Sequence, residues 1–178
     1  MTENEALEKA LEDRLDVARE VDLFADLIPE ELESIAALMI PVVFRSGQVI
    51  MKEGEMGHSM YVVAKGSVQV NKALTMKFGQ DDYRETEKTL IVLRGEDHPV
   101  IGEMSLVTES ERSATATSMT ECLLYEIDKN DFLTMAQSNP SLAFKVTLKI
   151  AGILSQRLKK ANDDAIRLTT ALSIALSR

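Results

Sequence analysis

Residues 101–117 of this 178-residue chain read Ile-Gly-Glu-Met-Ser-Leu-Val-Thr-Glu-Ser-Glu-Arg-Ser-Ala-Thr-Ala-Thr. Gly102 allows the backbone to turn and to approach a ligand closely. The amides of a short helical turn after it would point toward an anion. Glu103, an acceptor when ionised, suits hydroxyl donors, and Arg112 offers a planar fork of donors to a phosphate. This set of groups suggests a nucleotide, a small ligand that carries both hydroxyl and phosphate groups.

The same stretch resembles the phosphate-binding cassette of the cyclic nucleotide-binding domain family. This family includes catabolite-activator-type regulators, protein kinase A regulatory subunits and cyclic-nucleotide-gated channels. The matching positions are Gly102, Glu103, Met104, Ser105, Leu106, Arg112, Ser113, Ala114 and Thr115. Ile101 stands where the family pattern has an aromatic residue. Upstream, the glycine-punctuated segments 43–54 and 60–70 are similar to strands of the family, and the resemblance runs from about Leu23 to about Asn162.

The resemblance implies a cyclic nucleotide, cAMP or cGMP, as the ligand, and it implies a role for each matching residue. The implied contacts are Arg112, Ser113, Met104 and Ser105 for the cyclic phosphate, Gly102 and Glu103 for the ribose, and Asn162 for the base. Plainer interpretations stay open at two positions. Glu103 could be an acid at an ordinary helix N-terminus, and Arg112 could be an exposed arginine that balances Glu109 and Glu111.

Composition indicates a globular chain, with 45% hydrophobic and 28% charged residues. The N-terminus is acidic and does not read as a signal peptide, and no run approaches the length of a membrane-spanning segment. Cys122 is the only cysteine, which fits a reducing compartment. His58 and His98 lie far apart without a metal-ligand spacing. We therefore expect a cytoplasmic protein of bacterial type, with no metal and no membrane partner.

Charge is distributed unevenly along the chain, whose formal net charge is −9. Residues 1–35 hold 12 acids and 3 bases, whereas residues 145–178 hold 7 bases and 2 acids. An acidic first helix and a basic last helix could face each other within or between subunits, or both could be solvated surfaces. The overall acidity argues against direct binding of nucleic acid.

Hydrophobic periodicity predicts helices over residues 4–20 and from Pro29 to about Met39. The period then changes to short β-branched runs broken by glycines, at 42–44, 49–51, 60–63, 68–70, 90–93 and 123–127. Residues 71–89 are polar and fit a hairpin or loop, and Asp128 is a candidate N-cap for a helix to about Gln137. The pattern favours an α+β fold. Its centre is an antiparallel β-roll (a jelly-roll-like double-stranded β-helix), flanked by N-terminal helices and a long C-terminal helix.

Three parts are expected: an amphipathic helix over 1–22, the cyclic nucleotide-binding roll over 23–139, and the long helix over 140–178. In the long helix, Val146, Ile150 and Ile153 form one apolar stripe that suits packing on the roll. A second stripe is spaced 4-3-4-3-4-3, the repeat of a coiled-coil seam: Leu154, Leu158, Ala161, Ala165, Leu168, Leu172 and Ala175. We expect a homodimer through residues 154–175. The alternative is a helix folded back on its own domain.

No catalytic motif occurs in the chain, and we do not expect an enzyme. Bacterial regulators that this sequence resembles continue into a helix-turn-helix, which is not found here. The expected function is therefore a stand-alone cyclic nucleotide sensor that signals through its last helix to a protein partner. The alternative from another class is an interaction or scaffold module that uses the same fold without a ligand.

Overall fold

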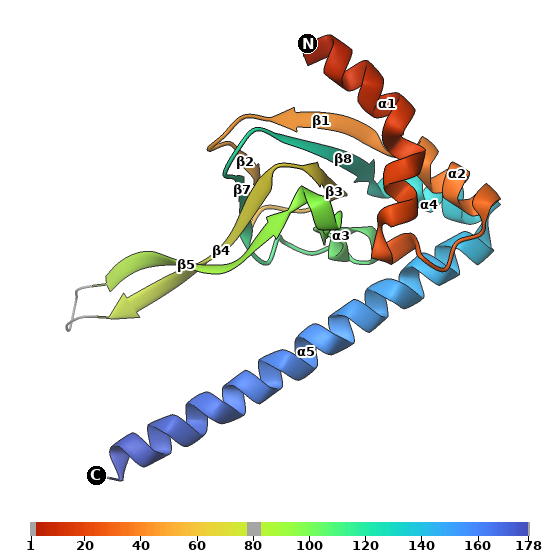
Figure 1. Cartoon of the computed structure of the whole chain (residues 1–178). Coiled ribbons are helices and arrows are strands. Elements are labelled where there is room, and N and C mark those ends of the chain that lie inside the picture. The colour runs from red at the N-terminus through yellow and green to blue at the C-terminus, as the bar shows by residue number, and fades with distance from the viewer. Residues whose placement is uncertain (1–2, 78–82, 178) are drawn as a thin grey trace.

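The computed structural model describes residues 3–77 and 83–177, and it shows a roll of two sheets with helices on one side (Figure 1). The strands are β1 (Ile40–Phe44), β2 (Val49–Met51), β3 (Ser59–Lys65), β4 (Ser67–Lys77), β5 (Tyr83–Arg94), β6 (Val100–Ile101), β7 (Thr115–Ser118) and β8 (Cys122–Asp128). The helices are α1 (Glu3–Glu20), α2 (Pro29–Ala37), α3 (Met104–Val107), α4 (Lys129–Ser138) and α5 (Pro140–Leu176), with 3₁₀ turns η1 (Asp22–Phe24) and η2 (Gly95–Asp97). The expected α+β fold with an antiparallel β-roll is confirmed.

The two sheets each contain four antiparallel strands. Sheet A has the order β1-β8-β3-β6, and sheet B has the order β2-β7-β4-β5. In sheet A, β8 lies between β1 and β3, with Phe44 opposite Cys122 and Tyr61 opposite Glu126. Pro41 lies in β1, at the edge of sheet A, where a missing amide costs no ladder hydrogen bond on the open side.

The inner strands of sheet A, β3 and β8, are buried on both faces, because their residues alternate between two cores. Val63 and Leu124 point into the roll, where they pack with residues of sheet B such as Val68 and Ala116. Val62 and Tyr125, their sequence neighbours, belong to the second core, which lies between sheet A and the helices. Helices therefore cover the outer face of sheet A, and residues of the two sheets pack together inside the roll.

Side-chain caps fix where the last two helices begin. The Asp128 carboxylate accepts hydrogen bonds from the amides of Asn130 (2.7 Å) and Asp131 (3.3 Å), as its predicted role as N-cap of α4 requires. Asn139 accepts from the Leu142 amide (3.2 Å) and starts α5 directly before Pro140.

Helix α5 packs on the domain with its first four turns and then leaves it (Figure 1). Val146 and Ile150 are buried in the helical core, and Ile153 packs against the same cluster, as predicted. Residues 155–177 are exposed. The alternative in which this part of the helix folds back on its own domain is therefore wrong for this structure. The homodimer through residues 154–175 stays a prediction.

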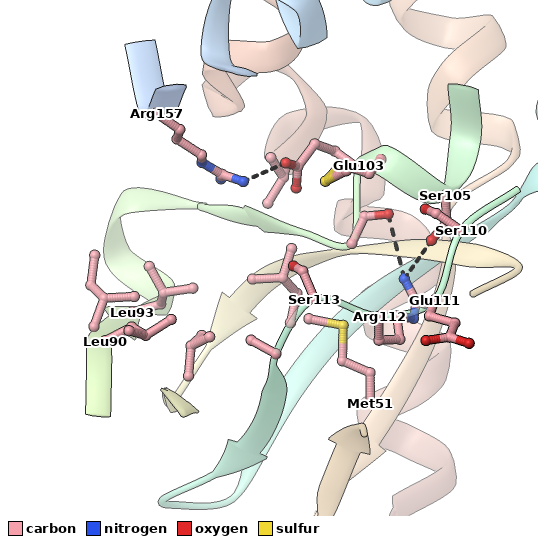
Figure 2. A pocket seen from close by; sticks show the side chains of 17 residues that line it. Met51, Leu90, Leu93, Glu103, Ser105, Ser110, Glu111, Arg112, Ser113 and Arg157 are labelled. Carbon is pink, nitrogen blue, oxygen red and sulfur yellow. Dashed lines mark hydrogen bonds and ion pairs between the residues drawn. The ribbon is translucent and has the colours of Figure 1, made fainter. Parts of the chain in front are cut away.

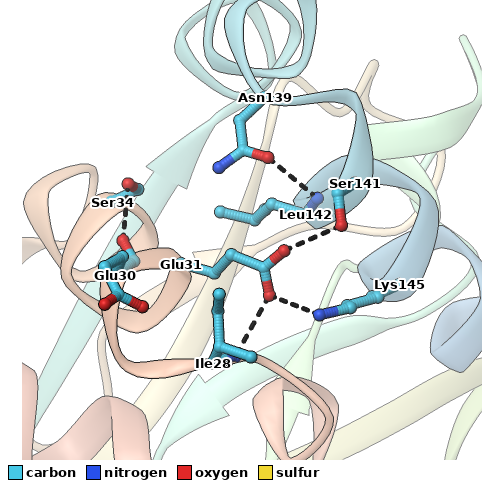
Figure 3. Close-up of polar contacts among 8 residues, drawn as sticks. All are labelled: Ile28, Glu30, Glu31, Ser34, Asn139, Ser141, Leu142 and Lys145. Atoms are coloured by element: carbon cyan, nitrogen blue, oxygen red, sulfur yellow. Dashed lines mark hydrogen bonds and ion pairs between the residues drawn. The ribbon is translucent and has the colours of Figure 1, made fainter.

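Ion pairs attach the N-terminal part of α5 to the acidic N-terminal region of the same chain. Lys145 contacts the Glu31 carboxylate at 2.6 Å, and Lys149 contacts Asp26 at 3.6 Å. Glu31 also accepts from the Ser141 hydroxyl (2.9 Å) and the Ile28 amide (3.0 Å) (Figure 3). These contacts show that the acidic and basic ends of the sequence meet, in part, within one subunit.

The predicted strands occur in the structure, and most are longer than predicted. The polar segment 71–89 forms the arms of the β4–β5 hairpin, in register from Ser67–Arg94 to Lys77–Tyr83, and residues 78–82 lie outside the described residues. Strands β6 and β7 were not predicted. Across the described ranges, no helix has both the length and the apolarity to cross a membrane, and no three metal-binding side chains cluster as a metal site would require.

Candidate functional site

A cavity of about 320 Å³ opens between the sheets, the segment 101–114 and α5 (Figure 2). Its polar end is formed by the segment that the sequence singles out, and its apolar end by β5 and neighbouring strands. The lining residues are Met51, Val70, Leu90, Ile91, Leu93, Val100, Ile101, Gly102, Glu103, Met104, Ser105, Ser110, Glu111, Arg112, Ser113, Ala114 and Arg157. Six of the seven predicted site residues line this one cavity.

Backbone hydrogen bonds fix the position of Arg112. Its amide donates to the carbonyl of Glu55 (2.8 Å), and its own carbonyl accepts from the amide of Gly54 (3.0 Å). Two residues further along the loop, the Gly57 amide donates to the carbonyl of Ser110 (3.3 Å). Backbone hydrogen bonds thus join the loop after β2 to the segment before β7. They hold Arg112 in place although no regular strand forms there.

The guanidinium of Arg112 is buried, with only 9% of the residue exposed. It donates to the Ser105 hydroxyl (2.9 Å), to the carbonyl of Gly102 (3.4 Å) and to the Ser59 hydroxyl (3.4 Å). No carboxylate lies within ion-pair distance of it in the described part of the chain. Burial lowers the pKa of the Arg112 guanidinium, and the nearby Tyr61, Glu126 and Glu103 oppose this shift. The interpretation of Arg112 as an exposed arginine that balances Glu109 and Glu111 is therefore wrong.

Two glycines make room for this side chain. Gly102 has a φ of +74°, and a Cβ at this position would collide with Nη1 of Arg112. At Gly57 a Cβ would collide with the Ser105 hydroxyl and would lie 2.9 Å from Nε of Arg112. Larger residues at either position would displace the guanidinium, so the two glycines and the arginine work as a unit.

Glu103 is almost completely buried, with 1% of the residue exposed. One carboxylate oxygen accepts a hydrogen bond from Nη1 of Arg157 at 2.5 Å, and the side chain of Arg157 is 56% exposed. Figure 2 shows the arginine reaching from α5 to the carboxylate. The pair links the long helix to the cavity, about one turn beyond the last buried turns of α5.

Of the other predicted site residues, Met104, Ser105 and Ser113 lie at the cavity and Asn162 does not. The Ser105 amide donates to the carbonyl of Gly102 (3.0 Å) as part of the turn into α3, and its hydroxyl accepts from Arg112. Met104 and Ser113 line the cavity, and Ser113 is exposed. Asn162 lies exposed on α5 and does not line the cavity. The ligand contacts assigned to these residues stay predictions.

A polar pair in sheet A lies behind the arginine. Tyr61, opposite Glu126 across β3 and β8, donates its hydroxyl to that carboxylate at 3.0 Å. Burial is the main reason why the pKa of Tyr61 is raised. Ser59, which accepts from Arg112, lies two residues before Tyr61 and so on the same face of β3. The pair therefore contributes negative charge near the arginine without contacting it.

Arg157 is the site residue that sequence reasoning did not assign. The one contact expected from the long helix was Asn162. Nothing local to Arg157 marks it, because its partner is 54 residues away in sequence. A cue did exist: Glu103 was expected in a pocket, and a buried carboxylate requires a partner.

Comparison with known proteins identifies the fold family. The family described as cyclic nucleotide-binding domain matches residues 41–139. The chain is 31% identical over 140 residues to the cyclic AMP receptor protein of Thermus thermophilus, covering 79% of this chain and 58% of that protein. The chain therefore spans little more than half the length of this relative.

Solved structures agree with this assignment. The N-terminal domain of a transcriptional regulator from Streptomyces coelicolor superposes with a TM-score of 0.65 at 31% identity, covering 83% of this chain and 93% of that one. A structure described as cAMP-bound PfPKA-R superposes with a TM-score of 0.58 at 30% identity, covering 71% of this chain and 42% of that one. From the family match over more than half of its length, the chain belongs to the cyclic nucleotide-binding domain family.

Proposed function

We propose that this chain is a regulatory module that binds a cyclic nucleotide, cAMP or cGMP, in the cavity beside Arg112. One observation carries the proposal: a buried guanidinium faces a cavity and has no carboxylate partner among the described residues. Burying an unpaired charge is costly. A phosphate that accepts from the same fork would compensate that cost.

Glu103 supports the ribose half of the proposal. Its carboxylate is buried at the same cavity, on the residue that follows the φ-positive Gly102. Only one of its oxygens has a hydrogen bond in the described structure, to Arg157. The second oxygen can accept a ribose hydroxyl. The apolar end of the cavity, with Leu90 and Leu93, suits the flat base.

Arg157 provides a route from the ligand to the long helix. It is the one α5 residue that lines the cavity among the described residues, and its partner is the proposed ribose acceptor. A ligand that changes the hydrogen bonds of Glu103 changes how firmly α5 is attached at this point. The helix can then differ between the free and bound states, provided that the ligand binds one of them better.

The output of the module is proposed to run through the exposed part of α5. Residues 154–175 form the seam of a homodimer, and a protein partner that the sequence does not name reads the change. The homology to regulators, such as the cyclic AMP receptor protein of Thermus thermophilus, supports a regulatory role instead of a catalytic one. The stand-alone character of the module stays a prediction.

The direct test is calorimetric titration of the purified chain with 3′,5′-cAMP and with 3′,5′-cGMP. Saturable binding of either ligand with one site per chain is expected. If neither binds at millimolar concentration, the sensor proposal fails, and the interaction module without a ligand becomes the better interpretation.

A further inference from the structure

A carboxylate inside the roll complements the buried arginine of the site. Glu126 lies in β8, on the same face as Leu124, whose side chain packs inside the roll. Glu126 is partly buried, and within the described residues it has one polar partner, the Tyr61 hydroxyl at 3.0 Å. No cation of the described chain lies within ion-pair distance of this carboxylate. Glu126 is therefore an anion without a direct counter-charge, as Arg112 is a cation without one.

Side chains on one face of sheet A lie between the two charges. Nη2 of Arg112 donates to the Ser59 hydroxyl (3.4 Å), and Ser59 precedes Tyr61 by two residues on the same face of β3. Tyr61 is the cross-strand neighbour of Glu126 and donates its hydroxyl to that carboxylate. Water is largely excluded from such a buried polar series, so the charges at its two ends are only weakly screened from each other.

Shifts in pKa agree with an interaction between these charges. Burial lowers the pKa of the Arg112 guanidinium, and among the groups that oppose this shift Tyr61 and Glu126 act more strongly than Glu103. Burial is also the main reason why the pKa of Tyr61 is raised, so the phenol is neutral at pH 7 and Glu126 carries the negative charge. Glu103, in contrast, already has a cationic partner in Arg157. The negative charge that Arg112 meets from inside the roll is therefore that of Glu126.

The position of Glu126 limits how much negative charge the cavity can accept. Neither Glu126 nor Tyr61 lines the cavity, so the carboxylate acts on a ligand from behind Arg112. The other cation among the lining residues, Arg157, is paired with Glu103. A first negative charge on a ligand meets the Arg112 guanidinium. A second one has no free cation to pair with, is repelled by Glu126, and makes the ligand more costly to remove from water.

We propose that Glu126 is a specificity-determining residue of the cyclic nucleotide site, which acts through Arg112 and favours a phosphate with a single negative charge. A phosphate diester carries one negative charge at neutral pH, whereas a phosphate monoester carries nearly two. Glu126 therefore favours a cyclic nucleotide over a 5′-nucleotide with the same base. This inference rests on the proposed function and adds to it the charge of the ligand and the residue that selects it.

The first test compares two ligands of different charge on the wild-type chain by calorimetry. 5′-AMP is mostly a dianion at pH 7, whereas its methyl ester, adenosine 5′-(methyl phosphate), is a monoanion with the same open linkage. The ester should bind at least roughly tenfold more tightly than 5′-AMP at pH 7. This advantage should largely disappear at pH 5, where about nine tenths of the 5′-AMP is monoanionic. Equal affinities at pH 7, whether high or low, or a difference that persists at pH 5, would overturn the proposal.

Glu126→Gln tests whether this residue causes the effect, because it removes the charge and keeps an acceptor for Tyr61. The Coulomb energy is proportional to the charge of the ligand. Both ligands should therefore bind more tightly, with a gain of roughly tenfold for 5′-AMP against roughly threefold for cAMP. A merely structural role would weaken both ligands. Unchanged or lowered affinities in Glu126→Gln would overturn the assignment.

Glu121→Gln is the matched control. It makes the same change at an exposed position that does not line the cavity, and it should leave both affinities unchanged. The experiment also separates the two proposals. If neither cAMP nor cGMP binds the wild type, the proposed function fails. If cAMP binds but the dependence on ligand charge is absent, only the role of Glu126 fails.

Discussion

At the scale of single residues, the site depends on one buried cation whose surroundings are arranged around it. Gly57 and Gly102 leave space for Arg112, and two serine hydroxyls and a carbonyl take part of its donor capacity. Hydroxyls and a carbonyl orient a guanidinium but do not cancel its charge. Arg112 is thus held in place and kept positive, which is what recognition of an anion requires.

Arg112→Ala tests this arrangement. Removing one partner of a buried charge-assisted pair costs about 2–5 kcal/mol. Cyclic nucleotide affinity should therefore fall by roughly thirty- to several-thousand-fold, as measured by calorimetry, while the melting temperature without ligand changes little. Arg94→Ala removes an exposed arginine outside the cavity and serves as the matched control. If Arg112→Ala bound the cyclic nucleotide as tightly as the wild type, Arg112 would not be the phosphate contact.

The proposed role of Glu103 is tested by changing both the ligand and the protein. If its carboxylate accepts from the ribose 2′-hydroxyl, 2′-deoxy-cAMP should bind the wild type more weakly than cAMP by ~1.5–3 kcal/mol, as for a hydrogen bond to a charged group. Against Glu103→Gln the difference between the two ligands should be much smaller. Equal affinities of the wild type for both ligands would leave Glu103 with a purely structural role.

At the scale of elements, α5 is attached to the rest of the chain by bases that face acids. Lys145 and Lys149 reach the acidic N-terminal region, and Arg157 reaches the cavity. The first two contacts lie beside the buried turns of the helix, so they add to an attachment that apolar packing already provides. The third lies where the helix begins to leave the domain, and there the ion pair is the main contact. Under the proposed function, a cyclic nucleotide in the cavity acts on this third contact.

A double-mutant cycle on Glu103→Gln and Arg157→Gln measures that third contact. Because more than half of the Arg157 side chain is exposed, solvent screening limits the expected coupling in the free energy of unfolding to about 1 kcal/mol or less. With saturating cAMP the coupling should change, because the ligand then shares the carboxylate of Glu103. A coupling that is the same with and without ligand would exclude Arg157 as the route to α5.

Glu31 makes the attachment of α5 dependent on pH. The hydrogen bond from Lys145 is the largest cause that lowers the pKa of Glu31 below its ordinary value of 4.5, and the Ile28 amide and Ser141 add to it against the effect of burial. A lowered folded-state pKa means that the contribution to stability is present above about pH 4.5 and is lost as the pH falls through the folded-state pKa. The melting temperature of the wild type should therefore fall more between pH 7 and pH 3.5 than that of Glu31→Gln.

Glu30→Gln is the control for this experiment. The residue is next in sequence, exposed, and its carboxylate forms no ion pair in the described structure (Figure 3). Its melting temperature should follow the wild-type curve. If the melting temperature of Glu31→Gln fell as much as that of the wild type between pH 7 and pH 3.5, other carboxyl groups would be responsible for the fall.

At the scale of the whole molecule, the structure leaves a long apolar stripe without a partner. Leu158, Leu168 and Leu172 are 63%, 72% and 59% exposed on α5. Apolar surface of this extent on a helix that projects from its domain marks an interaction site. The spacing of the stripe is that of a two-helix seam. A second copy of the same helix is the proposed partner.

Substitution of Leu158 and Leu168 together by lysine puts two charges into the seam. The double variant should be a folded monomer by light scattering, whereas the wild type should be a dimer. Gln156→Lys with Thr170→Lys adds the same charge at positions off the seam and should remain dimeric. A wild-type chain that is monomeric at high micromolar concentration, with and without cyclic nucleotide, would remove the dimer and leave α5 to a different partner.

The sequence by itself determined the elements whose signals are local. Short β-branched runs broken by glycines predicted most strands of the roll, and Asp128 predicted the start of α4. The spacing of Gly102, Glu103 and Arg112 predicted which segment lines the cavity of the candidate site. Strand β6 was not predicted because two residues are too few to show a pattern, and β7 was not predicted because Thr115–Ser118 contains no large apolar side chain.

Tertiary structure alone decided the state of each side chain in the site. Whether Arg112 is buried depends on Gly57 and Ser59, which the roll brings to it from another part of the chain. The pairing of Glu103 with Arg157 depends on the direction in which α5 leaves the domain. Such contacts join residues about fifty positions apart, and no local pattern encodes them, because their free energy comes from burial and charge that exist only once the sheets and helices have packed.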